Sequence, residues 1–205
     1  MGHKDVDIAL VYQEDMPAEP IELFRSEIAR DGVEVRIEKL PLPGPMAGTA
    51  LYMLSAVATF VTAKYFGALA EEAAKDHYPK LVKAMKQLAG RFAGKKGPSV
   101  TILHTVGKVT GDDFIYSLSY AAYAEYEPGV RLKLLFRNDA DQNEIDLGTD
   151  LFMATLRAIH SRTYTGGGIE GLREATPRGG LILVIFDQRT GTLKVLDPIQ
   201  QHFTH

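Results

Sequence analysis

Residues 6–40 read VDIALVYQEDMPAEPIELFRSEIARDGVEVRIEKL and predict a strand, a helix and a second strand. The apolar run VDIALVY is typical of a buried strand. Apolar residues then recur at helical spacing, and Asp31-Gly32 ends this helix because glycine adopts the left-handed conformation without strain. The segment VEVRIEKL alternates apolar and charged residues, which favours a strand with one face in water.

The next long feature is an uncharged segment from Met46 to Ala63. Its length is at the lower limit for a membrane span. Its Thr, Ser, Gly and Ala residues, and the absence of a flanking aromatic belt, favour a helix buried in the protein core. The helical pattern continues from Tyr65 to Lys75. We therefore expect no membrane span, and a peripheral membrane protein that uses residues 46–92 is kept as an alternative.

A basic amphipathic helix is expected to begin near Asp76, because Pro79 suits a first helical turn. Apolar residues at helical spacing form one face, which should be buried. This face consists of Leu81, Met85, Leu88 and Phe92. The other sides of the helix carry four cations, which are the candidate partner-binding residues of the chain. They are Lys80, Lys83, Lys86 and Arg91.

The charges of the chain are unevenly distributed. Residues 77–111 contain seven Lys or Arg and no acid, whereas residues 1–76 carry a net charge of −6 and residues 112–205 a net charge of −4. The basic block either pairs with acids of the same chain or forms a cationic stripe for an acidic protein partner. Nucleic acid is not expected, because the pI is about 6.1 and the block has few interleaved aromatic residues.

The C-terminal half predicts further strands around one long helix. Residues 114–126 fit either a strand or a helix, and the turn signal Glu127-Pro128-Gly129 before the strand VRLKLLF favours a strand. A helix over 143–161 and a hairpin closed by DQRTGT follow. The expected fold class is α+β, with a mixed or mainly antiparallel sheet packed on long central helices. We expect a single domain over residues 1–205, with possible sub-units 1–45, 46–97 and 98–205.

The acidic stretch from Asp139 to Asp150 resembles a calcium loop in its spacing. A calcium loop needs glycine at its sixth place, where this chain has Glu144. Asp141 followed three residues later by Glu144 instead predicts a capping box at the start of a helix. We therefore expect a helix cap and no calcium site.

Motifs of known catalysts do not occur in the sequence. The chain has no cysteine, no HExxH and no GxSxG, and its glycine clusters lack the Lys-Ser/Thr pair of a phosphate loop. We expect no cofactor, and no metal at Glu72, Asp76 and His77. A small enzyme whose site assembles in space from His104, His160 and the acids of residues 139–150 is kept as an alternative.

Several segments together resemble a known family. These are the N-terminal strand–helix–strand, the connector PGPMAG with its uncharged continuation, FGALAEEAAKDHYPKLVKAMKQL, VRLKLLF before an acidic helix start, and DQRTGTL. This order resembles the effector-associated constant components of bacterial conflict systems and related uncharacterised bacterial proteins, chiefly over residues 5–136. The resemblance implies an accessory module that couples a sensor to an effector in the bacterial cytoplasm, and it carries over no catalytic residue. The chain is longer at its C-terminal part than the short form of that family.

The sequence thus predicts a non-catalytic interaction or regulatory module. No signal peptide is recognised at the start of the chain, so we expect a cytoplasmic protein. The alternatives are the spatially assembled enzyme and the peripheral membrane protein.

Overall fold

The computed structural model describes residues 6–29, 32–42, 55–69, 76–98, 101–104, 107–110 and 115–197. For residues 101–104 and 107–110 the description covers the backbone. In chain order, the elements are β1 (Ile8–Gln13), α1 (Ala18–Ile28), β2 (Val35–Leu40), β3 (Val57–Val61), α2 (Ala63–Ala68), α4 (His77–Phe92), the 3-10 turn η2 (Gly94–Lys96), β4 (Thr101–His104), β5 (Gly107–Thr110), β6 (Tyr120–Glu127), β7 (Val130–Leu135), α5 (Gln142–His160), β8 (Ile169–Glu170), β9 (Leu181–Asp187) and β10 (Thr192–Val195).

Eight of the described strands form one sheet in the order β2-β1-β3-β6-β7-β9-β10-β8. Parallel and antiparallel neighbours alternate across the whole sheet, beginning with the parallel pair β2 and β1. β4 and β5 form a separate antiparallel pair. The fold class is α+β with a mixed sheet, as the sequence predicts. Strands from residues 1–45, 46–97 and 98–205 all join the large sheet.

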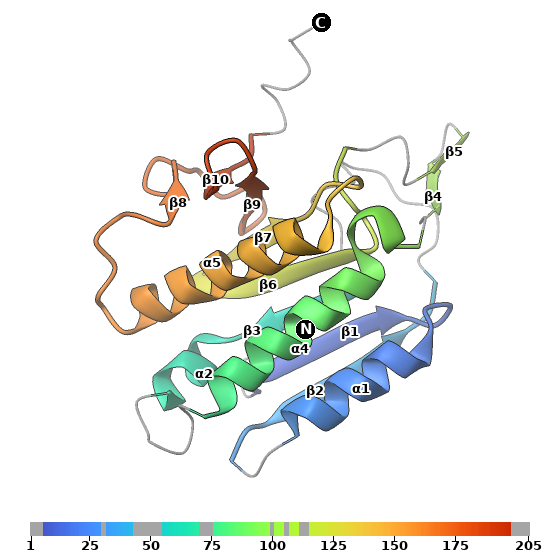
Figure 1. Ribbon diagram of the computed structural model, residues 1–205, viewed down its shortest axis with the longest axis horizontal. Helices are drawn as coiled ribbons and strands as arrows, with labels where there is room; N and C mark the ends of the chain where they lie inside the picture. Colours follow the sequence, from blue (N-terminus) through green and yellow to red (C-terminus); the bar gives the residue numbers. More distant parts are fainter. Residues whose placement is uncertain are drawn as a thin grey trace, which may run out of the picture.

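The helices lie on one face of this sheet. Figure 1 shows α1, α4 and α5 side by side in front of the strands, with α4 in the middle. The main core fills the space between the two layers and combines alternate strand residues with the inner helix faces. α4 contributes Leu81, Met85, Leu88 and Phe92, each at most 2% exposed. The predicted apolar face of the basic helix is therefore confirmed.

The N-terminal strand–helix–strand is also confirmed. β1 and β2 run parallel, and α1 between them buries Ile21, Phe24 and Ile28 against the sheet. Beyond the helix, Gly32 has a φ of 85°, the left-handed conformation that favours glycine. In the second half of the chain, β6 bears out the strand interpretation for residues 120–126, whereas residues 115–119 precede the strand and Phe114 lies outside the described residues. Gly129 turns the chain into β7 with a φ of 82°.

The prediction of a helix over Met46–Ala63 is wrong at its C-terminal end. Val57–Val61 is strand β3, which pairs antiparallel with β1 and parallel with β6. All five residues are buried, so both faces of the strand are covered and the run shows no apolar–polar alternation. A short apolar run of this kind does not distinguish a strand from a helix. Residues 43–54, and residues 70–75 of the predicted continuation, lie outside the described ranges.

A second apolar cluster lies on the sheet face away from the helices. Its centre is the Phe60 ring stacked on Tyr123, with ring centroids 4.6 Å apart. Lys133 lies on the same face with its ammonium 5.3 Å from the centroid of the Tyr123 ring, and its side chain is fully buried. Burial lowers the pKa of this amine to about 7.

No helix within the described ranges is long and apolar enough to cross a membrane.

Candidate partner-binding surface

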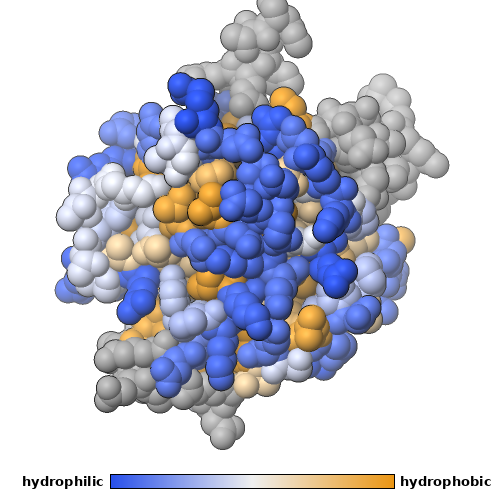
Figure 2. Space-filling view, in the orientation of Figure 1, coloured by the Kyte–Doolittle hydropathy of each residue, from blue (hydrophilic) through white to orange (hydrophobic). Residues whose placement is uncertain are grey.

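The four candidate cations lie along the outer side of α4. Lys80, Lys83 and Arg91 are exposed and Lys86 is half-buried. α1 and α5 flank this helix, so its outward cations are within reach of acids on both neighbours. Figure 2 shows that the helix-covered side of the molecule is mostly hydrophilic, with separate small hydrophobic patches.

Two of the four cations pair with acids of the same chain. The Lys83 ammonium lies 3.7 Å from the Glu27 carboxylate of α1, and the Lys86 ammonium lies 2.6 Å from the Asp150 carboxylate of α5. α4 is therefore joined to both neighbouring helices by ion pairs. For Lys83 and Lys86, the intramolecular interpretation of the basic block holds.

The other cations of this region make no ion pair with any described residue. These are Lys80 near the start of α4, Arg91 in its last turn, and Lys95 and Lys96 in the 3-10 turn that follows; all four are exposed. Arg91, Lys95 and Lys96 therefore form a cluster of positive charge where α4 ends, which we call the C-terminal cation cluster. The negative end of the helix dipole stabilises cations at this position.

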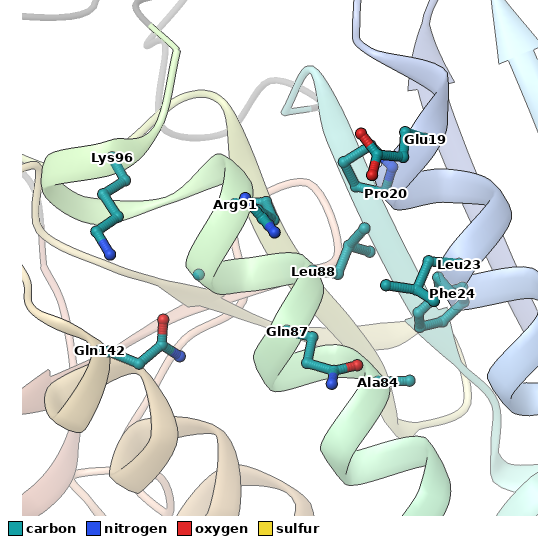
Figure 3. A pocket seen from close by; sticks show the side chains of 11 residues that line it. Glu19, Pro20, Leu23, Phe24, Ala84, Gln87, Leu88, Arg91, Lys96 and Gln142 are labelled. Carbon is teal, nitrogen blue, oxygen red and sulfur yellow. The ribbon is translucent and has the colours of Figure 1, made fainter.

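A groove of about 400 Å³ lies beside the C-terminal cation cluster. It is formed by α1, by residues 84–91 of α4, by Lys96 of η2 and by the start of α5, and Figure 3 shows the side chains that line it. The lining residues are Glu19, Pro20, Leu23, Phe24, Ala84, Gln87, Leu88, Gly90, Arg91, Lys96 and Gln142. Of these, the sequence predicted only Arg91 as a site residue. The Lys95-Lys96 pair directly after the basic helix was the signal that could have extended the prediction.

Gly90 shapes this groove from the α4 side. A Cβ atom at Gly90 would collide with the amide of the Gln142 side chain. Gln142 in turn donates hydrogen bonds to the Asp146 carboxylate at 2.7 Å and to the Lys86 carbonyl at 3.5 Å. The side chain of Gln142, the first residue of α5, thus packs directly against Gly90 of α4.

The acidic stretch from Asp139 to Asp150 forms a helix cap. The Asp141 carboxylate accepts from the Glu144 amide at 3.0 Å, and the Glu144 carboxylate accepts from the Asp141 amide at 2.9 Å. This is the predicted capping box. Asp139 accepts two hydrogen bonds from the Arg137 guanidinium at 2.7 Å, and these bonds lower the pKa of the Asp139 carboxyl. The described side chains include no group of three or more His, Asp or Glu that could hold a metal ion.

The histidine–carboxylate site expected for an enzyme is not assembled by α5. His160 ends this helix, and even Asp150, the nearest of the acids of residues 139–150, is ten residues and roughly 15 Å away along the helix axis. The His160 ring stacks on Phe66 at 4.9 Å, and its Nε2 lies 2.8 Å from the Glu125 carbonyl. His104 lies in β4, and its side chain is outside the description.

His77 is the buried histidine at the start of α4. Its Nε2 lies 2.9 Å from the Ile28 carbonyl, which can only accept, so Nε2 donates. Nδ1 of the neutral ring then accepts from the Tyr65 hydroxyl at 2.9 Å. Both ring nitrogens are therefore used to connect α1, α2 and α4, and the residue is not free to bind a metal. Glu72 lies outside the described residues.

Comparison with known proteins identifies no relative. No protein-family model, no curated protein and no solved structure matches the chain. The function of the protein is therefore inferred from the geometry of this surface.

Proposed function

We propose that the protein is a non-catalytic interaction module that binds an acidic protein partner through the outer surface of α4. The observation that carries this proposal is the division of the basic helix into two kinds of cation. Lys83 and Lys86 pair with Glu27 and Asp150, whereas Lys80 and Arg91 are exposed without an ion pair to any described residue.

The energies of exposed charges favour a role in binding for the unpaired cations. Exposed ion pairs contribute about 0–1 kcal/mol to stability, so unpaired exposed cations add little to the fold. They do attract an acidic surface over a Debye length of roughly 8–10 Å at physiological salt, and they raise the rate of association. Lys80 and Arg91 therefore contribute most to partner binding. Lys83 and Lys86 contribute less, because their charges are partly compensated by Glu27 and Asp150.

The resemblance to constant components of bacterial conflict systems extends the proposal to a biological setting. In that setting the protein is an accessory component in the bacterial cytoplasm, and the acidic partner is a sensor or effector of the same system. The resemblance lies in short structural segments, so this part of the proposal is tested by identifying the partner.

The experiment uses the full chain as bait against displayed fragments of its own genome. We expect retained fragments rich in Asp and Glu, with binding that weakens as salt rises. The double variant Lys80→Glu/Arg91→Glu should weaken binding by roughly tenfold or more, and Lys83→Glu/Lys86→Glu should weaken it less. Lys39→Glu/Arg189→Glu, with the same change of charge at exposed positions away from α4, is the control. Equal effects of all three variants, or no retained fragment, would contradict the proposal.

A further inference from the structure

The groove between α1 and α4 combines an apolar site with unpaired charge. Phe24 and Leu88 lie in its floor and are each 2% exposed, while Leu23 stands at its wall with 49% of its surface exposed. The exposed part of Leu23 borders the floor that Phe24 and Leu88 form, so it continues an apolar lining and does not stand alone on the surface. The three residues together offer a place for one apolar side chain of an occupant.

Charge is distributed asymmetrically around this apolar site. Arg91 and Lys96 lie on the α4 side, and neither makes an ion pair with a described residue. Glu19 lies on the α1 side, and Figure 3 shows it across the groove from Lys96. An occupant with carboxylates is therefore attracted toward Lys96 and Gln142 and repelled from the start of α1. The groove distinguishes the two ends of whatever binds it.

Resting on the interaction function proposed above, we infer that this groove binds a short acidic, amphipathic segment of a protein partner. One large apolar side chain of the segment sits on Leu23, Phe24 and Leu88. Carboxylates next to it in the segment pair with Arg91 and Lys96. The segment carries no acid at its end nearest Glu19.

The position of the charged groups favours a protein segment over a small anion. Sites for small molecules enclose most of the ligand and place a few polar groups inside. Here the charged ends of Arg91 and Lys96 belong to exposed side chains around a mostly buried floor. A polar, exposed rim around an apolar centre is the arrangement found in protein–protein interfaces.

Gly90 makes a direct test possible. Replacing it with Leu places a side chain in the groove and displaces the Gln142 amide, which is the far end of a flexible side chain. Glycine is less favourable than leucine inside a helix by roughly 0.8 kcal/mol, which offsets the loss of the exposed Gln142 hydrogen bonds, so the variant should remain folded. Gly90→Leu therefore blocks the groove without changing any charge.

The probe is a library of random twelve-residue peptides displayed on phage and selected on the full-length protein. We expect selected peptides to join a Leu, Ile, Phe or Trp to two or more Asp or Glu. Their binding, measured by fluorescence anisotropy, should fall by roughly tenfold or more in Gly90→Leu and in Arg91→Glu/Lys96→Glu. Gly67→Leu, at a position in α2 where an added Cβ meets no atom within 4 Å, is the matched control and should bind normally. Circular dichroism establishes that each variant is folded.

The outcomes separate this inference from the function on which it rests. If acidic peptides or genomic fragments lose binding on charge reversal at α4 but bind Gly90→Leu unchanged, the groove assignment is wrong and the interaction function stands. If no probe depends on the α4 cations, both are wrong. Two further measurements would also overturn the inference. These are self-association of the wild type that Gly90→Leu abolishes, which makes a second copy the occupant, and binding of a single-stranded oligonucleotide that Gly90→Leu abolishes.

Discussion

The Lys86 ammonium lies 2.6 Å from the Asp150 carboxylate and joins the middle of α4 to α5. Both side chains are partly exposed, so solvent screens the pair. We predict a coupling free energy of about 0.2–1 kcal/mol from a double-mutant cycle with Lys86→Met and Asp150→Asn, followed by urea unfolding. A coupling near zero would show that the pair does not join the two helices in solution.

Reversal of both paired cations tests their structural role from the other direction. In Lys83→Glu/Lys86→Glu, new carboxylates face Glu27 and Asp150. We predict that this variant unfolds with a free energy lower by about 1 kcal/mol, because like charges replace two ion pairs. Lys80→Glu/Arg91→Glu should be close to wild type, since neither residue has an ion pair with a described residue. Differential scanning calorimetry at low salt gives the stability of each variant. Equal losses of stability in the two variants would contradict the division of the helix into paired and unpaired cations.

The hydrogen bond between Tyr65 and His77 should contribute more than either surface pair. Tyr65 and His77 are each 1% exposed, so Tyr65→Phe leaves a buried acceptor at His77 Nδ1 without its donor. We predict a loss of about 1–3 kcal/mol in the free energy of unfolding. Tyr12→Phe, at a half-buried tyrosine of β1, is the matched control and should change stability by less than about 0.5 kcal/mol. A Tyr65→Phe variant as stable as this control would mean that the bond is not made.

The capping box at the start of α5 gives a prediction for both stability and calcium. Asp141→Ala removes the acceptor for the Glu144 amide and should lower stability by about 1 kcal/mol. Because these carboxylates are engaged with backbone amides, millimolar calcium should leave the melting temperature of the wild type unchanged. Calorimetric titration that detects micromolar calcium binding, lost in Asp139→Ala, would refute the second part.

Lys133 predicts how stability changes with pH. The pKa of Lys133 is about 7 in the folded protein, against the ordinary lysine value of 10.5 that applies to the unfolded chain. Between these two pH values the unfolded chain therefore binds more protons than the folded one. The free energy of unfolding should therefore rise with pH above about 7, with a slope of at most about 1.4 kcal/mol per pH unit from this residue.

The variant Lys133→Met isolates this contribution. It keeps an unbranched apolar stem on the sheet and removes the titrating amine, so it should raise stability at pH 7 and flatten the rise toward pH 9. Urea unfolding at pH 6, 7, 8 and 9 compares it with the wild type. Parallel pH profiles for the two proteins would assign the slope to other groups.

The elements best predicted from the sequence are those with a polar face. Polar residues identify the solvent-exposed part of each: the charged side of α4, the outward residues of β2, where apolar and charged side chains alternate, and the capped start of α5. The sequence predicts a helix at β3 because all five residues of this strand are buried. An apolar run with no solvent-exposed face shows no repeat of apolar and polar residues that would distinguish a strand from a helix. Its β-branched residues Val57, Thr59 and Val61 were the remaining signal.

The groove could not be predicted from local patterns. Leu23, Leu88 and Gln142 meet there from three elements that are each more than fifty residues apart, and a fold must be known before they are brought together. The exposed cations were found because charge can be read without a fold. Their division into paired and unpaired depends on Glu27 and Asp150, whose positions opposite α4 only the structure gives.

The alternation of strand directions distinguishes this sheet from a doubly wound parallel sheet. In a doubly wound parallel sheet all carboxyl ends lie at one edge, and the crevice beside them is the usual binding place. Here the directions change after every second strand, so the carboxyl ends of β1 and β2 lie at the same edge as the amino ends of β3 and β6. Within the described strands, neither edge of the sheet therefore collects all the carboxyl ends. If the proposed partner binds the outer face of α4, its specificity can change through surface substitutions that leave every strand unaltered.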